Sequence, residues 1–377
     1  MKAAVVGGGP AGALLAYHLA RDGADVTLLD HSHPREKPCG GGLTPRALEL
    51  LPPPPRHDPL PVRQAGRCRF ESGRGAAVEA ELPRPLAVGS RRLVDAWLLR
   101  RAIEAGAAHR VERVLAVDDS GVVRTSGGET RFDFVFGAHG ATSVARRCLV
   151  GPLPRERLAM AAGWFVPGDS PLVVRFTPGL SGYMWLFPRP DHVGVGICAP
   201  LGEAPTRQML DRLDAEVMRW FPALMDREAE RYAHLIPSPT TDPDSILEIA
   251  GGRWALVGDA GALADPITGE GIYFALRSAV LLAQTLRAGR TPRDYAERVL
   301  EDFGRELNKA AALRARFFRA AFSDRMVRYA HRSPAVRRVL VELVLGEQGY
   351  LGLKRRLARA LPSLLWRSAR AAFSRVA

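Results

Sequence analysis

The chain has 377 residues, of which 47% are hydrophobic and 25% are charged, and its formal net charge is +13. This length and apolar content suit two interleaved domains with a large buried core. No run of eighteen uncharged apolar residues occurs, since the best candidate, 271–286, contains Arg277, and this excludes a membrane-spanning helix.

The four cysteines, Cys39, Cys68, Cys148 and Cys198, are widely spaced and form no CxxC pair. This pattern argues against a zinc site or a disulfide framework and indicates a reducing cytoplasm. The first residues run directly into a predicted strand, so no secretion signal is expected. We therefore expect a cytoplasmic protein that holds no metal.

The N-terminal stretch predicts a strand–helix–strand unit. Lys2–Val6 is a short apolar run typical of a strand, and Ala13–Ala20 has a helical pattern. Ala24–Leu29 is a second strand, and Asp30 follows it directly. An acidic residue at this place is positioned to accept hydrogen bonds from ribose hydroxyls.

Three glycines with the G-x-G-x-x-G spacing lie between the first strand and the helix. Gly7 permits a tight turn, Gly9 admits a pyrophosphate close to the backbone, and Gly12 allows close helix–strand packing. Pro10 and Ala11 begin the helix, whose N-terminus faces the phosphates. The motif in this context predicts dinucleotide binding.

The following part of the chain mixes strand and helix patterns. Leu51–Pro61 is a proline-rich connector that cannot form a regular helix or an interior strand. Alternating patterns typical of strands dominate Gly151–Ser245. The individual predictions are a helix over Leu93–Ala105, hairpin-like strands within Val111–Thr125, and strands at Phe132–Phe136, Leu172–Phe176 and His192–Cys198.

The last third is predicted to be mainly helical. A buried strand over Trp254–Val257 precedes a long apolar helix over Gly271–Leu286. Pro292–Ala377 has a helical pattern with one break at Ser333-Pro334. Residues 301–377 contain seventeen Lys and Arg and six Asp and Glu, so this tail carries +11 of the net charge.

A second set of motifs distinguishes FAD from other dinucleotides. Asp259 ends the strand of residues 254–257 beside small residues and suits the ribityl hydroxyls of a flavin. The stretch of residues 265–271 then opens the long helix, whose N-terminal dipole favours an anionic reduced flavin. The predicted FAD contacts in this part of the chain are Asp259, Pro266, Gly269, Gly271 and Ile272.

With these motifs, residues 1–289 resemble the FAD-dependent oxidoreductases of the para-hydroxybenzoate hydroxylase fold. The resemblance implies that Asp259 contacts the ribityl chain and that Arg91 lies near the FAD phosphates, although Arg92 is adjacent. A family element that usually contains Asp-Gly carries His139 instead, which puts direct reduction by NAD(P)H in question. The alternative is that the imidazole N–H makes an equivalent hydrogen bond.

Two further stretches resemble the geranylgeranyl reductases. Pro38-Cys39-Gly40-Gly41-Gly42-Leu43 is similar to their PCGGGL segment. Residues 183–189, YMWLFPR, are similar to their YxWxFPK motif, with Arg189 in place of lysine. The implied fold is α/β (α+β), with a Rossmann-like FAD-binding domain at residues 1–50, 85–150 and 246–300, a strand-rich substrate domain at 51–84 and 151–245, and a basic helical region at 301–377.

This resemblance implies reduction of isolated carbon–carbon double bonds in a polyprenyl chain by FAD. Cys39, Tyr183 and Trp185 are the implied catalytic residues, and the proton donor is Cys39, Tyr183 or a bound water. Cys39, Gly40, Gly41 and Gly42 are expected to lie against the flavin. The expected substrate contacts are Leu43, Tyr183, Trp185 and Phe187.

The basic tail gives a hypothesis about partners. Residues 313–322 and 351–359 interleave cations with apolar side chains, as helices in an anionic membrane interface do. The expected partners are a prenyl-lipid substrate, NADPH or a ferredoxin-type electron donor, and an anionic membrane surface, but not nucleic acid. A monooxygenase or halogenase on the same scaffold is the alternative, and a non-catalytic flavin-binding protein is the second alternative.

Overall fold

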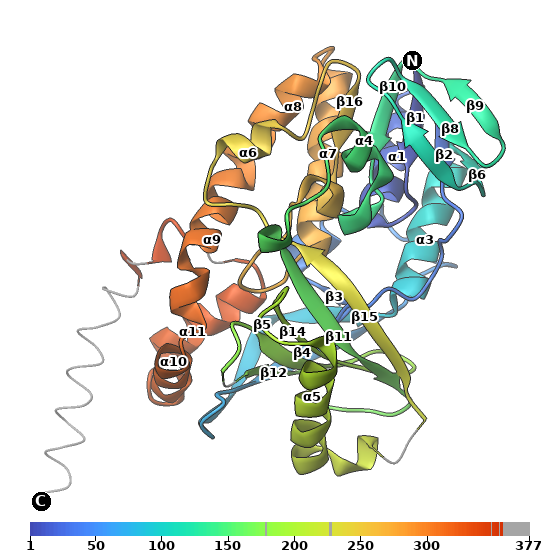
Figure 1. Ribbon diagram of the computed structural model, residues 1–377. Coiled ribbons are helices and arrows are strands. Elements are labelled where there is room, and N and C mark those ends of the chain that lie inside the picture. The colour runs from blue at the N-terminus through green and yellow to red at the C-terminus, as the bar shows by residue number, and fades with distance from the viewer. Residues whose placement is uncertain (178, 226–227, 348, 354, 357–377) are drawn as a thin grey trace, which may run out of the picture.

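The structure is a computed structural model that describes residues 1–377 except 178, 226–227, 348, 354 and 357–377. The chain forms two large β-sheets with helices packed around them (Figure 1). Residues from both parts line one cavity. The α/β (α+β) fold class predicted from the sequence is confirmed.

The first sheet has five parallel strands in the order β16-β10-β1-β2-β6. Four of its strands consist mostly of buried apolar residues because both faces of the sheet are covered there, whereas the edge strand β6 is polar and partly exposed. The strands are β1 (Lys2–Val6), β2 (Asp25–Leu29), β6 (Ala108–Arg110), β10 (Phe134–Gly137) and β16 (Trp254–Leu256).

Helices and a small third sheet complete the core around these strands. Helix α1 packs against α3 and α7, while apolar side chains of the third sheet enter the same core. The elements are α1 (Pro10–Arg21), α3 (Arg91–Glu104), α4 (Val144–Leu149), α6 (Asp244–Leu247), α7 (Ile272–Arg287), α8 (Pro292–Val299), β7 (Val114–Val117), β8 (Val122–Thr125) and β9 (Gly128–Arg131).

The second sheet has eight strands in the order β15-β11-β14-β13-β12-β4-β5-β3, all antiparallel except the β12–β4 pair. Helix α5 (Thr206–Trp220) and its short continuation pack on one face. The strands are β3 (Gly42–Leu43), β4 (Val62–Glu71), β5 (Ala77–Gly89), β11 (Leu158–Val166), β12 (Val173–Phe176), β13 (Tyr183–Pro188), β14 (Val193–Pro200) and β15 (Glu230–Pro237).

The C-terminal helices α9 (Arg305–Phe317), α10 (Ala320–Arg332) and α11 (Pro334–Val344) pack against the second sheet (Figure 1). Their core contains Val327, Val339 and Leu340 together with Phe70 of β4. The helix break predicted at Ser333-Pro334 is confirmed, since Pro334 begins α11. A short helix, α2 (Pro45–Leu48), follows β3 and packs against α7 and β5.

One expectation about the tail is wrong in part. Phe317 and Phe318 belong to the segment 313–322 that we expected to face a membrane, yet both rings are buried against Phe176. Apolar residues at helical spacing bury themselves wherever a sheet offers a partner face, and a single sequence does not show that partner. Four residues of the other expected segment, 351–359, lie outside the described residues, namely 354 and 357–359.

Two more differences concern the middle of the chain. Helix α5 lies within the part predicted to be strand-rich, and the long hairpin of β4 and β5 was not predicted. Strand β5 belongs to the second sheet up to Gly89, so it crosses the expected domain boundary at residue 85. The expected helices near 93–105 and 271–286 are present with ends shifted by one or two residues.

Candidate functional site

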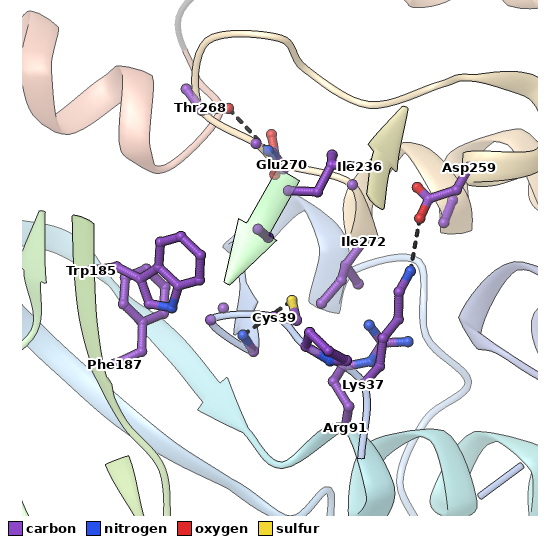
Figure 2. Close-up of a pocket in the computed structure, with 18 of the residues that line it drawn as sticks. Lys37, Cys39, Arg91, Trp185, Phe187, Ile236, Asp259, Thr268, Glu270 and Ile272 are labelled. Carbon is purple, nitrogen blue, oxygen red and sulfur yellow. Dashed lines mark hydrogen bonds and ion pairs between the residues drawn. The ribbon is translucent and has the colours of Figure 1, made fainter. Parts of the chain in front are cut away.

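An elongated cavity lies between the two sheets (Figure 2). The ion pair of Lys37 and Asp259 lies at one end, and the rings of Trp185 and Phe187 lie at the other. Cys39 lies between the two ends. The cavity therefore has a charged end for a polar ligand and an aromatic end for an apolar one.

The glycine-rich turn after β1 is built for close backbone contacts. Gly7 has φ +115°, and a Cβ there would lie 2.6 Å from the carbonyl carbon of Ala138. A Cβ at Gly12 would lie 1.9 Å from the oxygen of Gly7. Neither position admits a side chain. Gly9, Pro10 and Ala11, which lie between them, line the wall of the cavity.

Asp30 differs from the expectation that it contacts ribose. Its side chain is fully buried and does not line the cavity. It accepts hydrogen bonds from the Gly8 amide at 2.6 Å and from His33 Nδ1 at 2.8 Å. Burial acts to raise the pKa of Asp30, but the hydrogen bond and charge of His33 outweigh it and hold this pKa far below its usual range. The carboxylate therefore holds the glycine-rich turn in place.

Arg91 lines the cavity at the start of α3, whereas Arg92 is exposed. The Arg91 guanidinium donates to both oxygens of Asp95, at 2.9 and 2.8 Å. His33 Nε2 lies 3.6 Å from the same carboxylate. The buried contacts of Asp95 with Arg91 and His33 hold the Arg91 side chain in place on the cavity wall.

His139, which replaces the aspartate of the resembled family, also lines the cavity. Its Nε2 lies 4.0 Å from Asp30 Oδ2, which is beyond hydrogen-bond distance. Burial lowers the pKa of His139, so the ring is neutral at neutral pH. The alternative that the imidazole N–H makes the hydrogen bond of the family aspartate stays a prediction.

The charged end of the cavity is centred on Asp259. Lys37 Nζ lies 2.8 Å from Asp259 Oδ2. Burial acts to raise the pKa of Asp259, but the Lys37 charge outweighs it, so the carboxylate is ionised. Arg35 and His234 line the same end, and Nε2 of His234 is buried without a hydrogen-bond partner among the described residues.

The three consecutive glycines face protein groups as well as the cavity. A Cβ at Gly40 or Gly42 would lie 2.8 or 3.0 Å from the ring of Phe187. Gly41 has φ +82°, and a Cβ there would lie 2.2 Å from the Gly89 oxygen. Side chains at these three positions would therefore clash with the Phe187 ring or the β5 backbone. The three glycines also line the cavity, which is consistent with the expected contact with the flavin.

Arg189, the residue in place of the family lysine, holds this loop from behind. It is fully buried, donates to Glu36 Oε1 and to the Cys39 carbonyl, both at 2.5 Å, and lies 4.5 Å from the Phe165 ring. Glu36 in turn accepts from the Ser90 hydroxyl. A lysine has one nitrogen and cannot make this fork of contacts.

Tyr183 and Cys39 reach the middle of the cavity. The Tyr183 hydroxyl donates to the Thr268 carbonyl at 2.5 Å, and burial raises the pKa of this phenol well above its ordinary value. Gly269 has φ +69°, and a Cβ there would meet the Tyr183 hydroxyl at 2.5 Å. Cys39 Sγ accepts from the Gly41 amide at 3.3 Å, which leaves its S–H proton free to point into the cavity.

The aromatic end is closed by the C-terminal helices, which the sequence reading did not assign to the site. Trp185 lies over Gly196, where a Cβ would approach the indole to 2.1 Å. Apolar side chains from the two sheets and from α9 and α11 line this end: Phe70, Leu86, Val174, Phe176, Phe187, Phe317, Leu340, Leu343 and Val344.

The turn before α7 is held by residues from both ends of the chain. Glu270 accepts from the Thr44 hydroxyl at 2.8 Å and forms an ion pair with Arg46. Tyr350 donates its hydroxyl to Asp265 Oδ2 at 2.7 Å. The turn that carries Gly269 and Gly271 is thus fixed from both sides.

Most of the predicted site residues lie together. The residues brought to the cavity are Gly9, Pro10, Ala11, Cys39, Gly40, Gly41, Gly42, Arg91, Tyr183, Trp185, Phe187, Asp259, Gly269, Gly271 and Ile272. Leu43, expected to contact substrate, instead packs in the core of the first sheet, because β3 turns it away from the cavity. Pro266 lines a small neighbouring cavity behind Tyr183.

The residues around the cavity fit FAD. Three cations, Arg35, Lys37 and Arg91, face the same end as the glycine-rich turn, which suits a pyrophosphate. At that end the buried Nε2 of His234 has no hydrogen-bond partner in the part of the chain that the structure describes, so a ligand atom could pair with it. The fold and this site together define an FAD-binding oxidoreductase.

Comparison with known proteins gives the family. Residues 1–53 match the family model for an FAD binding domain. The chain is 30% identical over 315 residues to a menaquinone reductase of Mycolicibacterium smegmatis, covering 76% of each chain. It is 31% identical over 304 residues to a digeranylgeranylglycerophospholipid reductase of Methanopyrus kandleri, covering 72% of this chain and 76% of the relative. The chain belongs to the geranylgeranyl reductase family of FAD-dependent oxidoreductases.

Solved structures support the fold. A geranylgeranyl bacteriochlorophyll reductase-like protein from Thermoplasma acidophilum superposes with a TM-score of 0.76 at 19% identity, covering 95% of this chain and 98% of that one. A flavin-dependent brominase superposes with a TM-score of 0.72 at 18% identity, covering 100% and 99%. At these identities the likeness concerns the fold alone.

We predict that Gly41→Ala lowers FAD content strongly, because the new Cβ clashes with the Gly89 carbonyl and displaces the loop. Gly75→Ala is the matched control, since Gly75 has a similar φ of +87° but nothing within 4 Å of its Cβ position. The measurement is the flavin-to-protein absorbance ratio of each purified variant. Equal FAD content in the two variants would contradict the prediction.

Proposed function

We propose that this enzyme saturates isolated carbon–carbon double bonds of a prenyl chain, with FAD as the hydride source. The observation that carries the proposal is the continuous cavity whose charged end suits the cofactor and whose other end is aromatic and apolar. The names of the relatives support it, since they include a geranylgeranyl diphosphate reductase of Rhodobacter capsulatus. An extended isoprenoid needs such an apolar chamber beside the cofactor.

FAD held by the cavity residues would, in its reduced form, supply the hydride for one carbon of the double bond. An unconjugated alkene has no carbonyl to absorb negative charge, so the protein must stabilise positive charge at the more substituted carbon. The faces of Tyr183 and Trp185, whose ring centroids lie 5.8 Å apart, line the cavity there. Aromatic faces stabilise a nearby cation by about 0.5–2 kcal/mol.

The other carbon receives a proton, and the geometry favours Cys39 over Tyr183 as its source. The Tyr183 proton is engaged with the Thr268 carbonyl, so its transfer would break that hydrogen bond. The Cys39 sulfur only accepts a hydrogen bond, and its proton is available. As the two C–H bonds form, the π bond breaks, and the resulting thiolate regains its proton from water.

The C-terminal helices exclude water from the apolar end. Phe317 of α9 and Leu340 and Leu343 of α11 line the cavity opposite the second sheet. A dry chamber strengthens the interaction between a developing cation and the aromatic rings. We infer that α11 limits the part of the isoprenoid that can lie beside the cofactor.

We also propose an anionic membrane surface as the source of the lipid. The outer face of α10 presents two exposed aromatic side chains, Phe322 and Tyr329. Arg319, Arg325 and Arg332 are exposed on the same face at helical spacing. None of the helices in the described part of the chain has the length and apolar character needed to cross a bilayer. Such a face suits interfacial binding, with each cation near the surface worth about 1 kcal/mol.

The reducing equivalents are proposed to come from NADPH or a ferredoxin-type protein. Anaerobic mixing of the oxidised enzyme with each donor distinguishes them, since only the true donor bleaches the flavin absorbance rapidly. The activity itself is tested without either donor. Dithionite-reduced enzyme incubated with geranylgeranyl diphosphate should give products heavier by about 2 Da per saturated double bond. An unchanged prenyl mass, together with a long-lived oxygen adduct of the flavin in stopped-flow mixing with oxygen, would replace the proposal with a monooxygenase or halogenase.

Cys39→Ser is expected to keep FAD and to slow double-bond reduction about 100-fold, because a hydroxyl is a much weaker acid than a thiol. Cys148→Ser, at an exposed cysteine, is the control and should leave the rate unchanged. Single-turnover oxidation of the reduced flavin by substrate measures both. A Cys39→Ser rate equal to that of the wild type would remove this thiol from the mechanism.

The double change Arg325→Glu/Arg332→Glu should reduce sedimentation with phosphatidylglycerol vesicles by more than tenfold, because two attractive charges become repulsive. Arg207→Glu/Arg219→Glu makes the same charge change at exposed positions of α5, on the other face of the second sheet. This control should sediment like the wild type. Equal binding of the wild type to neutral and anionic vesicles would contradict the membrane proposal.

A further inference from the structure

A histidine of the second sheet faces the charged end of the cavity. His234 lies on β15, the edge strand that pairs only with β11. Side chains at alternate positions of a strand point to the same side, and both His234 and Ile236 line the cavity. Strand β15 also packs against the turn 258–261, which carries Asp259.

One ring nitrogen of this histidine, Nε2, has no hydrogen-bond partner among the described residues. Nε2 of His234 is buried and makes no hydrogen bond to any part of the chain that the structure describes. Nearly all buried polar side-chain atoms in proteins have a hydrogen-bond partner, because an unpaired one loses its hydration without compensation. An unpaired nitrogen on a cavity wall therefore indicates a ligand atom as its partner.

The surroundings of His234 show which ligand fits. The ion pair of Lys37 and Asp259 influences it most among the charged groups, followed by Arg35 and Arg91. Burial and then the Lys37 charge lower the pKa of His234, so the ring is neutral and offers one donor or one acceptor at Nε2. Three cations and a neutral imidazole around one carboxylate suit a polyhydroxylated, anionic chain.

We propose that His234 is a cofactor-contacting residue contributed by the second sheet, and that its Nε2 hydrogen-bonds the polar chain that joins the two ring systems of FAD. Among the predicted FAD contacts, Gly42 of β3 belongs to this sheet, but it has no side chain. Through His234 a side chain of the second sheet also holds the cofactor. The inference concerns FAD alone and does not depend on which substrate is reduced.

The test is a titration of apoprotein with FAD, followed by the change in flavin fluorescence. His234→Ala should weaken FAD binding about tenfold, and His234→Gln, which keeps a side-chain donor and acceptor, should recover part of the loss. His109→Ala is the matched control. Nε2 of His109 is also buried without a partner among the described residues, but His109 lies on β6 and does not line the cavity.

The melting temperatures of the apoproteins separate binding from folding. Weaker FAD binding in His234→Ala at an unchanged melting temperature, with His109→Ala binding like the wild type, supports the proposal. Wild-type affinity in both His234 variants would overturn it. The proposal would also be overturned if His234→Ala and His109→Ala lost affinity to the same extent and their melting temperatures fell in parallel. The weaker FAD binding would then result from a less stable fold.

Discussion

The buried pair of Arg189 and Glu36 holds the whole site together. Glu36 accepts hydrogen bonds from the Ser90 hydroxyl and from the Arg91 amide, so it also caps helix α3. Arg189 contacts the Cys39 carbonyl from the turn between β13 and β14. Removing one partner of a buried pair leaves an uncompensated charge and costs about 3–5 kcal/mol. The loop that carries Cys39 is therefore fixed to the second sheet and to the start of helix α3 through one charge pair.

The pair also explains how an arginine serves where the resembled family has lysine. His192 accepts a hydrogen bond from the Arg189 guanidinium at 2.9 Å, and burial and the Arg189 charge lower the pKa of His192. Gly194 leaves room for the guanidinium, since a Cβ there would lie 3.3 Å from its Nε. The broader side chain is thus accommodated by its immediate neighbours, and the loop position does not depend on the lysine.

Much of the fold and of the cofactor end followed from the sequence because its motifs are local. The glycine spacing after β1, the strand-end Asp259 and the triple glycine each depend on neighbours within a few residues. The partners of these groups depend on distant contacts and were not predictable. Asp30 turned toward His33 and Gly8, and Leu43 turned into the core, because of packing that a single sequence does not reveal.

The walls of the apolar end of the cavity also depend on distant contacts that local motifs do not predict. Leu340 and Phe317 have the helical spacing of core residues, but only the packing of α9 and α11 on the second sheet makes them walls of the site. The sequence did contain a signal for Lys37 as a site residue, because Lys37 directly precedes the PCGGGL stretch. His234 had none, because a lone histidine on a strand is usually an ordinary packed residue.

The hydrogen bond between Tyr350 and Asp265 has a consequence for the order of events in the cell. The turn 265–271 borders the cavity, yet one of its supports is contributed by a residue more than eighty positions later in the chain. During synthesis the first sheet and the glycine-rich turn emerge long before this support exists. We therefore expect stable loading of the cofactor to await the emergence of Tyr350 from the ribosome.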